Sequence, residues 1–386
     1  GTAGDVIAFA DYAATWQTNN LTVSPNGTDK IGGTNADVSL NTEGQSVTFV
    51  YVDSTQGWLN TMDSTSNVRG SPFVAATGGT ITTCGNYKIH TFTGPGDFTV
   101  TNAGTPVGST TVDYMVIAGG ASGGNGGDNG AGGGAGGFRL SNSTCMPAPL
   151  TSPLATPTAL PVSATGYPIT VGAGGAAVTG NPGPGGTLGN DGSNSIFSSI
   201  TSAGGGGGGI RNSPGGAGRS GGSGGGGGNI NTTPLPGGAG NTPPVSPSQG
   251  NPGGFGQSDN ASYSTTGGGG GAGSVGQDSS NPKSGDGGSG SYVVGSGFAG
   301  CNGTPGPICG AKYFAGGGGG GKHPARAVGQ GGVGGGGVGG SDPGPDAGAG
   351  VANTGGAGGG GSSGANPQNF GAAGGSGIVI IRYKFQ

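Results

Sequence analysis

The sequence predicts an all-β protein with little or no α-helix. In it, small N-terminal β modules precede a bundle of polyglycine-II helices closed by terminal β-strands. Glycine supplies 106 of the 386 residues, about four times the ordinary share of about 7%. Only 15 of these glycines fall in residues 1–115. Short apolar–polar alternations separated by turn residues fill that N-terminal part, and no window carries a capped helical stripe.

Residues 1–75 predict a small β module that serves fibre assembly. Its strand candidates are short alternating runs bounded by turn residues, at 5–10, 20–24, 38–40 and 46–52. Thr48 is the one polar residue among residues 47–52. We therefore expect both faces of that strand to be covered, which suits packing inside an oligomer.

Residues 76–118 predict lead-in strands, with candidates at 80–83, 87–92, 97–101 and 112–118. Within them, the alternation of residues 88–91 favours a solvent-facing position for His90. The chain ends in an apolar run at 377–385, so residues 376–386 predict a closing strand. Because this run and the 112–118 run flank the glycine-rich part, we expect the two strands to pair.

Residues 119–375 predict a glycine-rich body. Its longest glycine runs lie at 204–209, 224–228, 267–271, 316–321, 334–337 and 358–361. Ordering glycine costs more backbone entropy than ordering any other residue, and a three-residue-per-turn helix has no internal hydrogen bonds to offset it. Without side chains, however, such helices can lie close together and bond sideways, which satisfies the backbone. Collagen is excluded because no Gly-X-Y register persists.

The composition argues against catalysis. The glycine loops lack the following helix that phosphate binding needs, and nothing positions Asp342 and Asp346 as a catalytic carboxylate pair. His90 and His323 stand apart from each other and from any cysteine cluster. Basic residues are sparse, and no apolar stretch of about 20 residues occurs. We therefore predict no enzyme, no catalytic residue, no cofactor, no metal, no nucleic acid and no membrane insertion.

Candidate recognition residues lie between the glycine runs. The aromatic residues could pack under loops or stack on sugars; they are Tyr263, Tyr292, Tyr313 and Phe314. The basic cluster could be a solvated loop or could contact an acidic glycan; it comprises Lys322, His323 and Arg326. Cys301 and Cys309 could close a short loop as a disulfide, or could remain free thiols. Cys84 and Cys145 are not assigned to each other.

Several segments together resemble the glycine-rich domains of tail-fibre proteins from marine and cyanobacterial phages. The segments are 112–120, 133–139, 169–175 and 374–383, with the lead-in residues 78–93. The N-terminal segments 11–15, 19–23 and 49–58 are similar to small β modules repeated along such fibres. In related polyglycine adhesins of T-even-like phages, glycine helices form a sandwich whose tip loops contact the host receptor.

The resemblance implies an extracellular, virion-borne tail-fibre protein that acts as a receptor-binding adhesin. Its implied partners are further copies in a homotrimer, other tail-fibre or baseplate proteins, and a host surface glycan or outer-membrane protein. The alternative is a structural subunit of an extracellular or cell-surface filament. An ice-binding bundle is a third alternative, although the loops are irregular. Because the sequence starts without Met, we expect a longer parent chain or a processed precursor.

Overall fold

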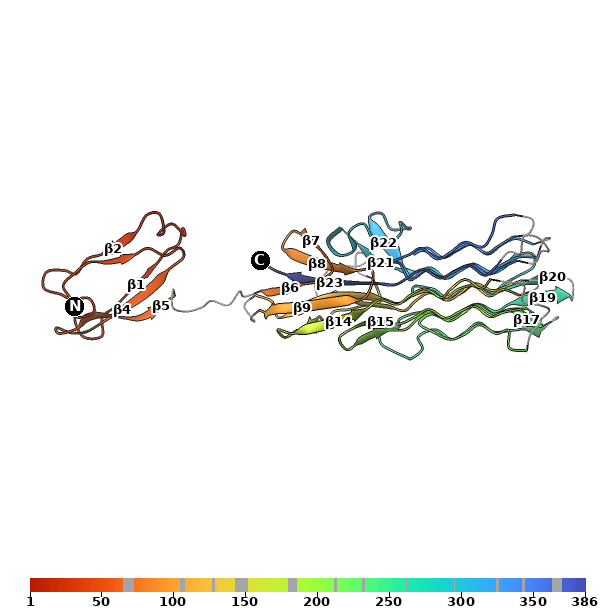
Figure 1. The fold of residues 1–386 in the computed structure, drawn as a ribbon, viewed down its shortest axis with the longest axis horizontal. Helices are drawn as coiled ribbons and strands as arrows, with labels where there is room; N and C mark the ends of the chain where they lie inside the picture. The colour runs from red at the N-terminus through yellow and green to blue at the C-terminus, as the bar shows by residue number, and fades with distance from the viewer. Residues whose placement is uncertain are drawn as a thin grey trace. The chain divides into compact units, whose positions relative to one another are not determined.

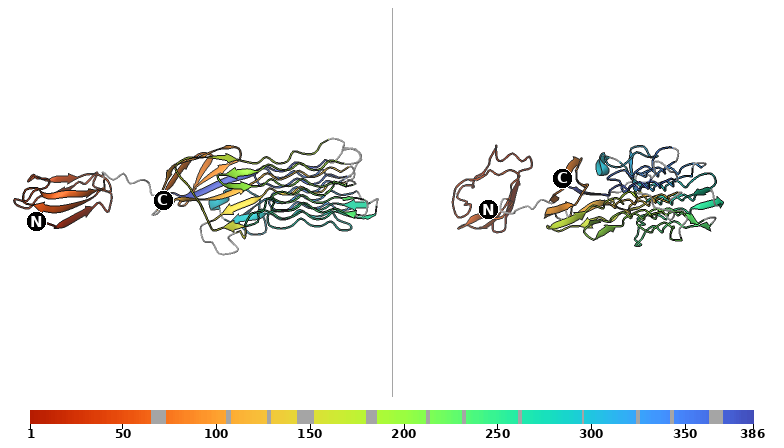
Figure 2. Two further views of the ribbon diagram at one scale, coloured as in Figure 1. Left: turned by 90° about the horizontal axis from the view of Figure 1, so that it is seen from below. Right: turned by 45° about the vertical axis from the view of Figure 1, so that its right-hand side comes forward.

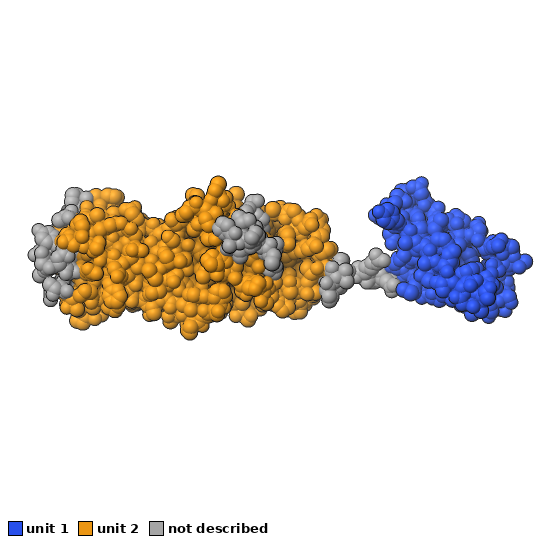
Figure 3. All heavy atoms as spheres, turned by 180° about the vertical axis from the view of Figure 1, so that it is seen from behind, with its two compact units in different colours: residues 1–72 blue, residues 73–386 orange. Residues whose placement is uncertain are grey.

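The protein divides into two compact units, residues 1–72 and residues 73–386 (Figure 3). A computed structural model describes residues 1–64, 73–104, 108–126, 129–142, 152–179, 186–211, 214–230, 233–260, 263–294, 296–323, 326–341, 344–362 and 370–386. Its described secondary structure is β throughout, except for the single helical turn α1 (Ser296–Ala299). The predicted all-β fold is confirmed.

The first unit contains two small antiparallel sheets. One has the order β1-β4-β5 and the other pairs β2 with β3; the strands are β1 (Val6–Ala10), β2 (Leu21–Val23), β3 (Val38–Leu40), β4 (Ser46–Asp53) and β5 (Gly57–Asp63). Their facing sides enclose a core of buried apolar residues, namely Ile31, Leu40, Val47 and Phe49. Only one face of β4 is buried within the chain, since Val52 on the other face is 42% exposed. Coverage of that second face by an oligomer stays a prediction.

The second unit begins with two larger sheets. The first has the order β12-β11-β10-β23-β8-β7, with β13 also paired to β10, and the second has the order β16-β15-β14-β9-β6 (Figures 1 and 2). Their strands are β6 (Val74–Thr77), β7 (Thr80–Cys84), β8 (Tyr87–Phe92), β9 (Gly96–Ala103), β10 (Thr111–Ile117), β11 (Phe138–Ser141), β12 (Ala155–Thr156), β13 (Leu160–Pro161), β14 (Gly166–Thr170), β15 (Ser195–Phe197), β16 (Ile200–Ser202) and β23 (Ile378–Lys384).

The strands β10 and β23 pair antiparallel, with Ile117 opposite Ile378, which confirms the predicted closure by the terminal strand. Both strands are covered on both faces. Val112, Tyr114 and Val116 face the second sheet. The alternate residues face a hairpin of β21 (Ser291–Val294) and β22 (Ala311–Phe314) together with α1. This two-sided cover explains the unbroken apolar runs at 114–118 and 378–381.

His90 lies inside this sandwich and is 0% exposed, so the predicted solvent-facing position is wrong. Its Nδ1 donates to the carbonyl of Gly78 at 2.7 Å, since that oxygen can only accept. Its Nε2 accepts from the Tyr383 hydroxyl at 3.1 Å. Both polar ring atoms are therefore satisfied, which permits burial where the alternation predicted exposure.

Beyond the sheets, the glycine-rich chain runs back and forth as extended tracts (Figure 1). Every third residue of a tract donates its backbone N–H to the same neighbouring tract. In tract 118–125, the first set donates to tract 130–137 at 2.9–3.1 Å, in the pairs Ala118–Gly137, Ala121–Gly134 and Gly124–Ala131. The set that starts one residue later donates to tract 187–193, and the set that starts two residues later donates to tract 371–377. Three residues per turn is the period of the polyproline-II helix, so the predicted lateral bonding of glycine helices is confirmed.

The tracts form a hexagonal array. Tract 130–137 is the centre and bonds to an inner ring of six tracts: 118–125, 203–210, 221–228, 266–272, 314–322 and 354–362. Eleven further tracts make an outer ring: 172–178, 187–193, 216–219, 235–241, 249–256, 274–279, 283–290, 327–333, 335–341, 346–351 and 371–377. Backbone bonding across this array, together with the sheet core, holds the second unit together.

The strands continue the registers of the tracts. Residues 115 and 140 pair across β10 and β11. Three residues further along one strand and three residues back along the other, Ala118 and Gly137 are hydrogen-bonded in the tracts, so the antiparallel register is unchanged. A second example is the hairpin of β19 (Gln257–Asn260) and β20 (Tyr263–Thr265), which continues tracts 249–256 and 266–272. A third is the pair β17 (Asn229–Ile230) and β18 (Thr233–Pro234). Sheet and array are thus one hydrogen-bonded system.

The interior tracts exclude most side chains. A Cβ built on Gly269 would lie 1.8 Å from the carbonyl oxygen of Gly133, and one on Gly123 would lie 2.0 Å from that of Gly359. Both obstacles are backbone atoms of neighbouring tracts, which cannot turn aside as a side chain can. The outer ring has solvent on one side, so larger residues stand there at three-residue intervals, as at 173, 176 and 179.

We predict that Gly269→Ala destabilises the second unit by about 2–3 kcal/mol, because the added methyl must push two tracts apart. Chemical denaturation of the full chain, followed by circular dichroism, measures the change. Gly94→Ala is the matched control, because a Cβ at Gly94 meets nothing within 4 Å. Equal stability of the two variants would show that the tracts are not close-packed.

A second prediction concerns pH. Burial lowers the pKa of the His90 imidazole, its bond to Gly78 opposes this, and the charge of Lys88 lowers it further. In the unfolded chain the His90 imidazole therefore binds a proton near pH 6.5, whereas in the folded chain it binds that proton less readily. Stability is fully present above that pH and declines as the pH falls toward 5. Thermal melts should show this decline in the wild type and a weaker one in His90→Gln, whereas identical slopes would contradict it.

Candidate recognition surface

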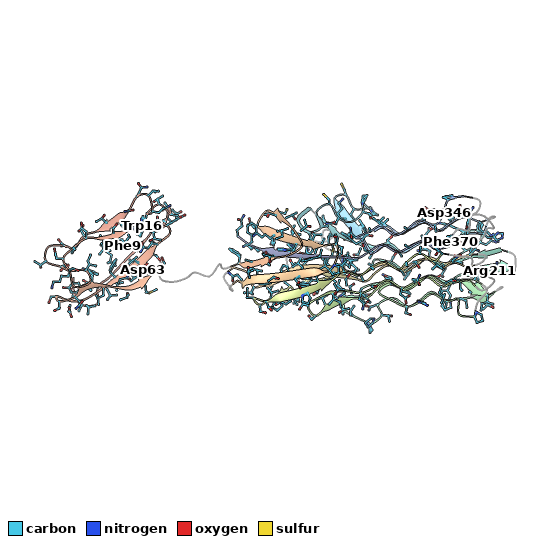
Figure 4. The ribbon with its side chains drawn as sticks, in the orientation of Figure 1. Phe9, Trp16, Asp63, Arg211, Asp346 and Phe370 are labelled. Carbon is cyan, nitrogen blue, oxygen red and sulfur yellow. The ribbon has the colours of Figure 1, made fainter. Side chains whose placement is uncertain are left out.

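Connections from the whole glycine-rich sequence meet at one end of the tracts, which we call the tip. It carries the hairpins β17–β18 and β19–β20 and is opposite the sheets (Figure 1). Isolated β-bridges link its connections to one another; they join Asn125 to Thr187, Asn129 to Ser362, Gly130 to Ile210, Val178 to Gly371, Thr265 to Lys322 and Lys283 to Ala327. Figure 4 places Arg211, Asp346 and Phe370 toward this end. The tip is therefore a composite surface on an ordered support.

Small polar side chains bind the carbonyls at the ends of the interior tracts. Thr266 Oγ1 donates to Gly130 O at 2.9 Å, and Ser284 Oγ donates to Gly321 O at 2.7 Å. Asn229 Nδ2 donates to the carbonyls of residues 257 and 265 at 2.9 and 3.1 Å. All three polar residues are buried. The sequence signal for this role is a polar residue directly beside a glycine run, as at Thr266 and Asn229.

The predicted basic cluster lies at the tip. Lys322 donates its backbone N–H to Gly340 O at 3.1 Å, and the Arg326 N–H donates to His323 O at 2.9 Å. The Arg326 guanidinium bonds the side-chain oxygen of Asn281 in the neighbouring connection. Lys322, His323 and Arg326 are all half-buried.

A second basic residue of this area is already neutralised. Lys283 Nζ lies 2.6 Å from Asp286 Oδ2, and the other oxygen of Asp286 accepts from the Gln330 N–H at 2.7 Å. Lys283 is therefore paired within the chain, and Lys322 and Arg326 are the Lys and Arg residues of the predicted cluster. Tyr263 belongs to β20 at the same end, but its side chain lies outside the described part of the chain.

The other predicted aromatic residues lie at the sheet end. Phe314 is 0% and Tyr313 6% exposed, so neither offers a face to a receptor. Phe314 belongs to the apolar core that covers the outer face of the first sheet. The Tyr313 ring lies against Gly306 in the loop that precedes β22. Tyr292 is half-buried opposite Tyr313 with ring centroids 5.4 Å apart, and burial raises its pKa. The structure thus separates these residues from the basic cluster.

Cys301 and Cys309 are exposed free thiols, so of the two alternatives that the sequence left open the structure has the free thiols. The loop is closed by backbone bonds instead, since Thr304 and Tyr313 exchange N–H···O bonds of 2.9 and 2.8 Å. Cys84 is also a free thiol, and Cys145 lies outside the described residues.

The described residues hold no group of three or more His, Cys, Asp and Glu side chains suited to a metal ion. Of the carboxylates considered above, Asp346 is exposed and Asp342 lies outside the described residues. Nor does the described chain contain a helix with the length and apolar character needed to cross a membrane.

A family model described as a glycine-rich domain matches residues 91–384, which include β9, β10, the entire tract array and β23. No curated protein matches the chain.

Proposed function

The chain belongs to the glycine-rich domain family, and we propose that it is a virion tail-fibre protein whose tip binds a bacterial surface. The observation that carries the proposal is the gathering of connections from residues 125 to 371 at one end of a backbone-bonded support. Recognition commonly resides in loops held by a rigid scaffold. The tip is such an arrangement, and the first and last strands of the second unit, β6 and β23, lie among the sheets.

The chemistry of the tip favours a polar, acidic ligand. Lys322 and Arg326 carry positive charge, and each donates its backbone N–H to a hydrogen bond within the chain. Guanidinium and ammonium groups bind carboxylate and phosphate groups strongly. We therefore propose an acidic surface glycan or lipopolysaccharide as the ligand, with an outer-membrane protein as the alternative.

The first test is binding to bacteria. We predict that the double variant Lys322→Gln/Arg326→Gln binds intact susceptible cells about tenfold more weakly, because each charged hydrogen bond contributes about 1.5–3 kcal/mol before solvent screening. Fluorescently labelled protein and a panel of candidate cells measure the binding. The matched control is Lys88→Gln/Lys312→Gln, which removes the same charge from strands at the sheet end. Equal losses of binding in the two variants would show that net charge alone causes the effect. No loss of binding in either variant would refute a role for the basic cluster.

The second test concerns assembly. We propose a homotrimer in which the half-exposed face of β4 is covered by a neighbouring copy. Light scattering at micromolar concentration should then give three times the chain mass of 35.6 kDa. A stable monomer would remove the trimer from the proposal and leave tip recognition untouched. Electron micrographs separate the alternative, because a filament subunit gives open-ended polymers.

A further inference from the structure

The outer ring of the array has a gap. Successive outer tracts bond to one another around the whole circumference except between tracts 187–193 and 216–219. A hexagonal second ring has twelve positions, and described tracts fill eleven of them. The inner tract 203–210 lies directly beneath the gap, so it has tract neighbours on five sides where the other inner tracts have six.

The backbone of tract 203–210 shows what the gap lacks. The N–H groups of residues 205 and 208 donate to tract 118–125, and those of residues 206 and 209 donate to tract 221–228. The third set is Gly204, Gly207 and Ile210. Ile210 donates to the carbonyl of Gly216 in the wall tract at 3.0 Å, whereas Gly204 and Gly207 point to the gap and donate to side chains. Asn194 Oδ1 accepts from Gly204 at 2.9 Å, and Asp191 Oδ1 accepts from Gly207 at 2.8 Å.

These two side-chain oxygens take the place that backbone carbonyl oxygens of a neighbouring tract would have. They are three residues apart and run antiparallel to the two donors, which is the pattern made by carbonyls of an antiparallel tract elsewhere in the array. Arg219 holds one of them in place from the opposite wall, with Nη1 3.2 Å from Asp191 Oδ2. Both side chains of this ion pair are about half exposed, so the closure is a surface contact.

Toward the tip, the gap is hollow. A cavity of about 440 Å³ lies there between the two walls, lined by Gly186, Leu188, Asn190, Ile210, Gly215 and Arg219. A tract is the shape that matches this space, because its two walls and its floor are themselves tracts. Large side chains have no room toward the floor, where residues 204–209 are all glycine.

We propose that the gap is an insertion site for a glycine-rich segment of another polypeptide in the same three-residue-per-turn conformation. Asp191 and Asn194 then act as displaceable substitutes for its carbonyls. The segment accepts hydrogen bonds from Gly204 and Gly207 and fills the twelfth position. This site is on the side of the array and is independent of receptor binding at the tip.

The test uses the full chain and a synthetic peptide with three Gly-Gly-Ala repeats flanked by lysines. We expect Asp191→Ala/Asn194→Ala to bind the peptide at least tenfold more tightly than the wild type, because the competing acceptors are gone. Amide NMR shifts should change at Gly204 and Gly207. The control is Asp278→Ala, which removes a side-chain acceptor 2.8 Å from the Phe255 N–H between two filled outer positions and should leave affinity unchanged.

Arg219→Gln covers the case in which the double variant fails to fold, because it frees Asp191 without removing any acceptor of the array. It should also bind the peptide more tightly than the wild type. Unchanged affinity in the folded double variant, or in Arg219→Gln if the double variant does not fold, would overturn the proposal. So would binding with no shift at Gly204 and Gly207. The polar side chains would then be permanent caps.

Discussion

The backbone hydrogen bond between neighbouring glycine tracts is the interaction on which the second unit depends. A tract of this kind makes no bonds within itself, so no single tract has a reason to be ordered alone. Order arises only when a tract has partners on several sides, and tract 130–137 has six. Residues far apart in sequence must therefore order together, and the entropy cost of each glycine is offset by bonds to several distant segments.

The β-sandwich gives this cooperative assembly its starting point. The strands β10, β11 and β23 have an apolar core of the ordinary kind, with side chains such as Met115, Phe138 and Ile380 fully buried. These strands lead without interruption into tracts 118–125, 130–137 and 371–377 in unchanged register. Side-chain packing, which is specific, thus sets the alignment of glycine backbones, which by themselves carry no information about register.

Sequence reasoning predicted the parts of this fold that follow from composition and from local pattern. The glycine excess led to lateral bonding, and the apolar runs at 112–118 and 377–385 led to the closing strand pair. It failed where a residue's environment is built by distant segments. The alternation of residues around His90 predicts an exposed side chain. The side chain is buried instead, because its two ring nitrogens form hydrogen bonds with Gly78 and Tyr383. Phe314 lies between glycine runs and is a candidate recognition residue by sequence, yet it covers a sheet assembled from both ends of the second unit. The order of tracts in the array could not be predicted, since one glycine run is chemically the same as another.

The alignment of all tracts along one axis also determines how the second unit would respond to pulling. A force applied between the tip and the sheet end acts along the tract axes and therefore across the lateral hydrogen bonds. Such shear loads many bonds simultaneously, whereas peeling one outer tract away would break them in succession. The bonds flanking tract 130–137 on six sides would share that load. A body without a large side-chain core can in this way be mechanically stiff along one direction.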